Sequence, residues 1–205
     1  MSKAIGMVEY KTTAAGVTAA DLMVKTSEVD IIEAQTVCPG KFIAIIAGDL
    51  SAVKAAVDAA TKQLPLQLID TFVLGNPHES IFPAIVGTSN VEDVKALGIM
   101  ETYDAAQIIV AADEAAKTAN VSLIEIRLAR GMCGKSYLML TGEVAAVEAA
   151  IERARKATQK NGMYLDSSVI ARPDKKIINT ILQRKKKLQI CMLGFAIFLN
   201  LPKTR

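Results

Sequence analysis

The chain contains the same segment twice, and this internal repeat constrains its fold more than any other feature of the sequence. Residues 4–9 (AIGMVE) return as residues 96–101 (ALGIME), and the register then holds along each copy with two short insertions. Matching pairs include Ala20 and Ala112, Lys25 and Lys117, Gly40 and Gly134, Gly48 and Gly142, Pro77 and Pro173, and Ile81 and Ile177. Because a repeated segment folds as one structural module, the sequence predicts two domains, 4–86 and 96–182, joined by a linker of residues 87–95.

Each copy has the hydrophobic pattern of an α/β (α+β) unit with the element order β-α-β-β-α-β. Apolar and β-branched runs predict strands in the first copy at residues 4–10, 29–37, 41–48 and 66–74. Apolar residues at three- and four-residue intervals predict helices at residues 13–27 and about 51–62, with Asp49 or Ser51 as the cap of the second. A short helical turn follows, with Ile81, Phe82 and Ile85 on its apolar side. This order, the split βαβ arrangement, predicts a ferredoxin-like mixed sheet with both helices on one face.

The composition excludes several classes of function. Apolar residues make up 51% of the chain and charged residues 22%, which is typical of a globular protein with buried cores. The net charge is only +3, aromatic residues are 4% and Trp is absent, so no nucleic-acid partner is expected. The sequence contains no dinucleotide or phosphate-binding loop and no nucleophile elbow. We therefore do not expect an enzyme.

Cysteine spacing argues against a disulfide framework. Cys38, Cys133 and Cys191 show no chelating spacing, and no signal peptide precedes the first copy. We expect a cytoplasmic protein.

A tail at residues 183–205 has no counterpart in the first copy. It combines a basic run with an apolar stretch at residues 188–201, which is shorter than the about 20 residues of a membrane-spanning helix. No membrane partner is expected. A packed terminal helix, an interfacial helix and a non-native extension all remain open, and the tail is assigned no function.

The segments at residues 4–9, 20–25 and 39–42 resemble the shell domain of bacterial microcompartments. The duplication is similar to the tandem, non-permuted members of that family. The resemblance implies a homotrimer that mimics a hexagonal tile, a pseudohexamer. It also implies that tiles join edge to edge with other shell proteins into a polyhedral shell around enzymes. The expected role is architectural rather than catalytic.

Four residues are candidates for contacts at the edge of such a tile. The resemblance implies that Lys25 and Lys117 lie at the edge and donate to backbone carbonyls; without it, both would be interpreted as solvated lysines. His78 is the only histidine and has no nucleophile or metal ligand near it in the sequence. Its Pro-His pair resembles the edge motif of the family, and Arg172 stands in the second copy's version.

The turn of Cys38, Pro39, Gly40 and Lys41 lies between the second and third predicted strands. In the shell family this turn lines the central opening of the tile. Three copies of Cys38 would then converge and could bind three irons of one [4Fe-4S] cluster per trimer. The turn resembles that of tandem shell proteins of propanediol-utilisation microcompartments that carry such a cluster. This implies electron transfer across the shell, with a redox partner enzyme, or cluster delivery. From the residues alone, a small buried hydrophobe is the favoured interpretation of Cys38, and it is the resemblance that favours a metal ligand.

The second copy's turn, with Met132, Cys133 and Gly134, is two residues longer. Met132, not Cys133, stands three residues before Lys135, so Cys133 is not equivalent to Cys38. We interpret it as a thiol near the opening, with ligation left open.

Two alternatives to a cluster-carrying tile remain. One is a cofactor-free tile whose central pore passes small metabolites. The other is a ferredoxin-like signalling trimer that binds a nucleotide between subunits, but the phosphate-binding group of Gly and basic residues that it needs is not found.

Overall fold

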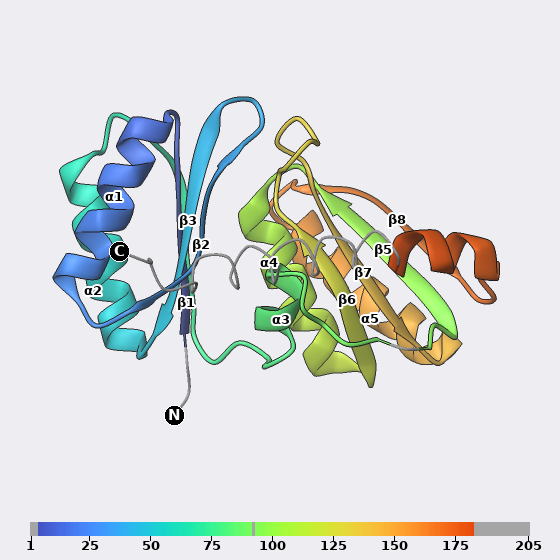
Figure 1. Ribbon diagram of the computed structural model, residues 1–205. Helices are drawn as coiled ribbons and strands as arrows, with labels where there is room; N and C mark the ends of the chain where they lie inside the picture. Colours follow the sequence, from blue (N-terminus) through green and yellow to red (C-terminus); the bar gives the residue numbers. More distant parts are fainter. Residues whose placement is uncertain (1–3, 92, 183–205) are drawn as a thin grey trace, which may run out of the picture.

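The computed structural model describes residues 4–91 and 93–182, which form two similar α+β domains (Figure 1). The predicted tail at 183–205 lies outside the described residues. Within the described part, no helix is long and apolar enough to cross a membrane.

Both domains have the predicted element order. The first consists of β1 (Ala4–Tyr10), α1 (Thr13–Thr26), β2 (Asp30–Val37), β3 (Lys41–Gly48), α2 (Leu50–Gln63) and β4 (Leu68–Leu74). The short helix α3 (Ile81–Ile85) follows it. The second domain consists of β5 (Ala96–Thr102), α4 (Ala105–Thr118), β6 (Val121–Arg127), β7 (Ser136–Gly142), α5 (Val144–Gln159) and β8 (Tyr164–Ile170). Asp49 is the N-cap residue of α2, although its side chain makes no capping hydrogen bond.

The prediction of a mixed sheet is wrong, because every strand pair is antiparallel. The strand orders are β2-β3-β1-β4 and β6-β7-β5-β8. Each helical connection joins two parallel strands, but it passes over a strand that lies between them. Parallel strands are therefore never neighbours.

Strand β1 is buried at all of its positions because both faces of the first sheet are covered. Val8 and Tyr10 pack with α1 and α2 in one cluster. Ile5 and Met7 belong to a second cluster, which includes residues of α4 from the other domain. The first sheet therefore lies between its own helices and the second domain, as Figure 1 shows.

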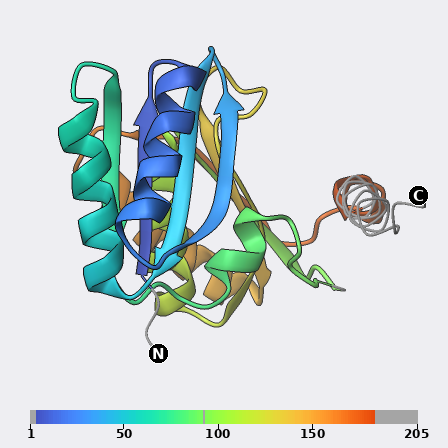
Figure 2. The same ribbon diagram turned by 60° about the vertical axis from the view of Figure 1, so that its left-hand side comes forward.

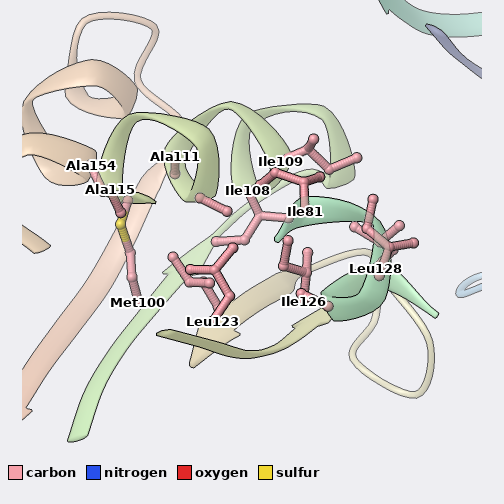
Figure 3. Packing of buried hydrophobic residues seen from close by; sticks show 14 of the residues in the cluster. Ile81, Met100, Ile108, Ile109, Ala111, Ala115, Leu123, Ile126, Leu128 and Ala154 are labelled. Atoms are coloured by element: carbon pink, nitrogen blue, oxygen red, sulfur yellow. The ribbon is translucent and has the colours of Figure 1, made fainter. Parts of the chain in front are cut away.

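Helix α3 follows the first domain in sequence but packs on the second. Ile81 and Ile85 join the cluster that contains Ile126 and Leu128, and Figure 3 shows Ile81 beside these residues. The C-terminal segment of the first copy thus extends over β6 of the second copy.

One buried contact differs between the two copies in a complementary way. A Cβ atom on Gly16 would lie 2.3 Å from the ring of Phe42, so α1 approaches β3 closely there. The equivalent residues in the second domain are Ile108 and Ser136, both buried. The first copy places a small helix residue against a large strand residue, and the second copy places a large helix residue against a small strand residue. The two pairs therefore fill a similar volume.

We expect Gly16→Ala to destabilise the protein by about 1–3 kcal/mol, because the added methyl group overlaps Phe42. This loss exceeds the gain of about 1 kcal/mol in helix propensity. Urea-induced unfolding at a fixed protein concentration measures the change. Gly75→Ala is the matched control, because its Cβ would meet no atom closer than 3.6 Å. Equal stability of G16A and the wild type would contradict the close contact.

Candidate functional site

The two predicted turns lie side by side in one chain. The backbone N–H of Cys38 donates to the carbonyl of Ala129 over 3.2 Å. A Cβ atom on Gly134 would lie 3.6 Å from the carbonyl oxygen of Cys38. The structure therefore brings the β2–β3 turn of the first domain against the β6–β7 turn of the second.

The β2–β3 turn borders open space. The backbone N–H of Gly40 donates to the carbonyl of Val37 over 2.9 Å, and the bond between Cys38 and Pro39 is cis. Gly40 has a φ of 95°, which favours glycine, and a Cβ atom there would meet nothing within 4 Å. The Cys38 thiol is free and half-buried. One thiol per chain thus stands in a turn whose tip is open.

The β6–β7 turn has a different backbone path. Cys133 has a φ of 53°, and its free thiol is exposed. Met132 accepts a hydrogen bond from the backbone N–H of Lys135 over 3.1 Å. The structure agrees with the sequence comparison that Cys133 is not the counterpart of Cys38, although it places the two turns together.

Ion pairs hold the bases of both turns within the chain. The Lys41 ammonium lies 2.7 Å from Glu9, whose side chain is only 4% exposed. The Arg130 guanidinium lies 2.8 Å from Glu33 and also donates to Gln35. Burial raises the pKa of Glu33, while Arg130 acts in the opposite direction. Lys41 therefore anchors the turn to β1, and Arg130 joins the second domain's turn to β2.

A carboxylate at the N-terminus of α4 faces the first domain. Asp104 caps the helix by accepting the backbone N–H of Gln107 over 2.7 Å. Burial raises the pKa of Asp104, and the hydrogen bond from the Gln107 backbone opposes this. The nearby charges of Asp70 and Glu9 also raise the pKa, whereas Lys41 lowers it. Sequence reasoning missed this group, because the equivalent residue in the first copy is Thr12.

Two of the predicted edge residues meet at the joint between the domains. The backbone N–H of His78 donates to Asp113 Oδ1 over 2.7 Å, and its Nδ1 lies 2.8 Å from Ser80 Oγ. Lys117 Nζ lies 2.6 Å from Asp113 Oδ2 and donates to the carbonyl of Asn76 over 2.9 Å. Sequence reasoning missed Asp113, although its spacing to Lys117 recurs as Asp21 and Lys25.

The other two edge residues stay at the surface. Lys25 pairs with Asp21 over 2.6 Å, and its side chain is 70% exposed. Arg172 is exposed after β8. Their contacts with another tile remain predictions.

Among the described residues, no group of three or more His, Cys, Asp or Glu side chains could hold a metal ion. Cys38 is therefore not part of such a group among these residues.

The sequence matches the BMC domain family twice, at residues 4–77 and 96–173. It is 39% identical over 173 residues to the bacterial microcompartment shell protein PduT of Citrobacter freundii, covering 84% of this chain and 94% of that protein. It is 35% identical over 95 residues to the bacterial microcompartment shell protein EutM of Salmonella typhimurium, covering 43% of this chain and 99% of that protein.

A solved structure has the same arrangement of both domains. The crystal structure of a microcompartments protein from Desulfitobacterium hafniense superimposes with a TM-score of 0.85 at 41% sequence identity. The match covers 87% of this chain and 99% of that chain. The relative placement of the two domains is therefore shared with a solved relative.

The raised pKa of Asp104 gives a pH-dependent prediction. Ionised Asp104 destabilises the folded chain above its raised pKa, and this effect disappears below the ordinary carboxyl pKa of about 4. Asp104→Asn removes the charge and keeps a good N-cap. We expect D104N to unfold at a higher urea concentration than the wild type at pH 7 and at the same concentration at about pH 3. Asp58→Asn, on the exposed face of α2, is the control. A constant difference at both pH values would contradict the electrostatic origin.

Proposed function

The chain belongs to the BMC-domain family of bacterial microcompartment shell proteins, and from this premise we propose that it forms a trimeric tile that carries a [4Fe-4S] cluster on its threefold axis. Its function as a structural component of the shell follows from the family. The observation that supports the trimer is the joint between the domains. Among the described residues, the helix surface of the first domain and the sheet surface of the second that correspond to this joint stay partly exposed.

Equivalent helices are buried to very different extents. In α4, Ile109 is 0% exposed, and Figure 3 shows it on the side of the helix away from Leu123 of its own sheet. Its counterpart in α1, Val17, is 53% exposed. The same repeated apolar position is thus buried in the second domain and exposed in the first.

The complementary sheet surface is open in the second domain. In the first domain, Met7 and Ile45 are 0% exposed, since they pack in one cluster with α4. Their counterparts Ile99 and Met139 are only half-buried. Within the described residues, the chain therefore leaves an α1 surface and a sheet surface partly exposed, and these correspond to the two sides of its internal joint.

Repeating the internal joint between chains produces a head-to-tail contact. Such heterologous contacts close into rings when the rotation per step divides a full turn. Three chains supply six similar domains, which is the number that a hexagonal tile needs. The trimer would present six similar edges to other shell proteins.

Ring closure supports a shared site for Cys38. Three chains would contribute three thiolates, the number that binds three irons of a cubane cluster, while the fourth iron takes another ligand. The free, half-buried thiol and the open tip of the turn fit this role. When bound, the cluster supplies one-electron transfer. The tile would then pass electrons across the shell to a redox partner enzyme, or deliver the cluster.

The trimer is tested by Val17→Glu. The exposed side chain allows the chain to fold, but a buried unpaired charge at the joint should raise the trimer dissociation constant at least about a hundredfold. Sedimentation measures the mass, and circular dichroism checks the fold. Leu66→Glu is the control, because Leu66 is 83% exposed in the loop before β4. A trimeric V17E protein would overturn the proposed joint.

The cluster is tested by anaerobic reconstitution followed by visible spectroscopy and by iron and sulfide assays. We expect about one cluster per three chains in the wild type. Cys38→Ser should lose the iron and the charge-transfer absorption, while Cys133→Ser, the matched thiol control on the neighbouring turn, should retain both. Colourless wild-type trimers would overturn the cluster and leave a tile whose opening passes small metabolites.

A further inference from the structure

We infer that a network of four charges closes the joint between chains: Asp21 and Lys25 of one chain with Arg172 and Asp174 of the next. The equivalent positions of the joint inside each chain hold Asn76 and His78 in place of the arginine and the aspartate. The joint between chains therefore gains a salt-sensitive contribution from Arg172 and Asp174 that the internal joint lacks at the equivalent positions. This inference rests on the proposed trimer.

The internal joint shows how the loop after one domain docks on the helix of the next. Asp113 accepts the backbone N–H of His78 through Oδ1 at 2.7 Å and pairs with Lys117 through Oδ2 at 2.6 Å. Lys117 also donates to the carbonyl of Asn76 at 2.9 Å. The Asp113 side chain is only 5% exposed. An Asp and a Lys one helical turn apart thus bind the backbone of the arriving loop.

The loop after β8 has the same local form as the loop after β4. In the first copy, His78 Nδ1 accepts the backbone N–H of Ser80 at 3.3 Å. In the second copy, Asp174 Oδ1 accepts the backbone N–H of Lys176 at 2.8 Å. Asp174 and His78 therefore each accept the backbone N–H of the residue two positions later. Among the described residues, no helix carboxylate accepts the backbone N–H of Asp174, whereas Asp113 accepts that of His78.

The equivalent Asp–Lys pair on α1 of the first domain is already formed and is exposed. Asp21 and Lys25 form a 2.6 Å ion pair whose side chains are 57% and 70% exposed. The equivalent Lys117 is 41% exposed. Ile177 is 54% exposed, whereas its counterpart Ile81 is 0% exposed beneath the internal joint. Figure 2 shows the helical segment of residues 175–182 extending away from both domains.

Placing that loop on the next chain's helix gives the contacts. Lys25 donates to the carbonyl of Arg172, and the backbone N–H of Asp174 donates to Asp21. The side chains of Arg172 and Asp174 then add one positive and one negative charge beside the existing ion pair. Exposed charge pairs weaken when salt shortens the screening length from about 10 Å at 0.1 M to about 3 Å at 1 M.

The test is the rate at which chains exchange between isotopically labelled and unlabelled trimers, followed by native mass spectrometry after incubation in low or high NaCl. The variant R172N/D174H gives the loop after β8 the same residues that the internal joint has at the equivalent positions, Asn76 and His78. We expect high salt to accelerate exchange at least about fivefold in the wild type and less than about twofold in the variant. The control E152H/R155N removes a matched acidic and basic pair from α5 and should keep the wild-type salt dependence.

The outcomes distinguish a failure of the charge network from a failure of the trimer. Trimers whose exchange rate is independent of salt, or equally salt-dependent in R172N/D174H, overturn the charge network and leave the trimer standing. Wild-type protein that is monomeric at both salt concentrations overturns the trimer itself, and the charge network with it.

Discussion

The burial of α4 between two sheets is the interaction on which the rest of the structure depends. One side of the helix covers its own sheet, and the other side packs in one cluster with Ile5 and Met7 of the first domain. This joint fixes the two domains relative to each other and places their turns together. Among the described residues it also leaves the outer side of α1 and the corresponding face of the second sheet partly exposed. In the proposed trimer, the contact between chains repeats the packing that unites the domains.

The repeat allowed most of the fold to be predicted. A pattern found twice, with apolar residues at strand or helix intervals, located the strands and helices of both domains close to their observed positions. The antiparallel sheet was not predicted, because local periodicity does not specify which strands are neighbours. Strand order depends on how the two helical connections pack over the sheet. The positions of Gly16 and Ile108 show how the copies diverged while this packing was kept.

The sequence located the turn of Cys38 but could not predict what surrounds it. The residues around Asp104 come from different domains, and its counterpart Thr12 lacks the charge, so the repeat gave no signal. The contacts of Lys117 with Asp113 and of Lys117 with Asn76 likewise depend on domain placement. The spacing of Asp and Lys recurs in both copies, but a spacing of four residues on a helix is common in solvated ion pairs. Only the joint shows that this pair binds a loop.

In the proposed trimer, the internal joint recurs between chains, and the three Cys38 turns face a common axis. The most direct measurement is the structure of the purified assembly by electron cryomicroscopy. We expect a ring of three chains in which each α1 is covered by the second sheet of a neighbour, as α4 is covered by the first sheet. The Cys38 thiols should lie close enough to share one cluster. Exposed α1 helices, or Cys38 turns on the outer rim, would contradict it.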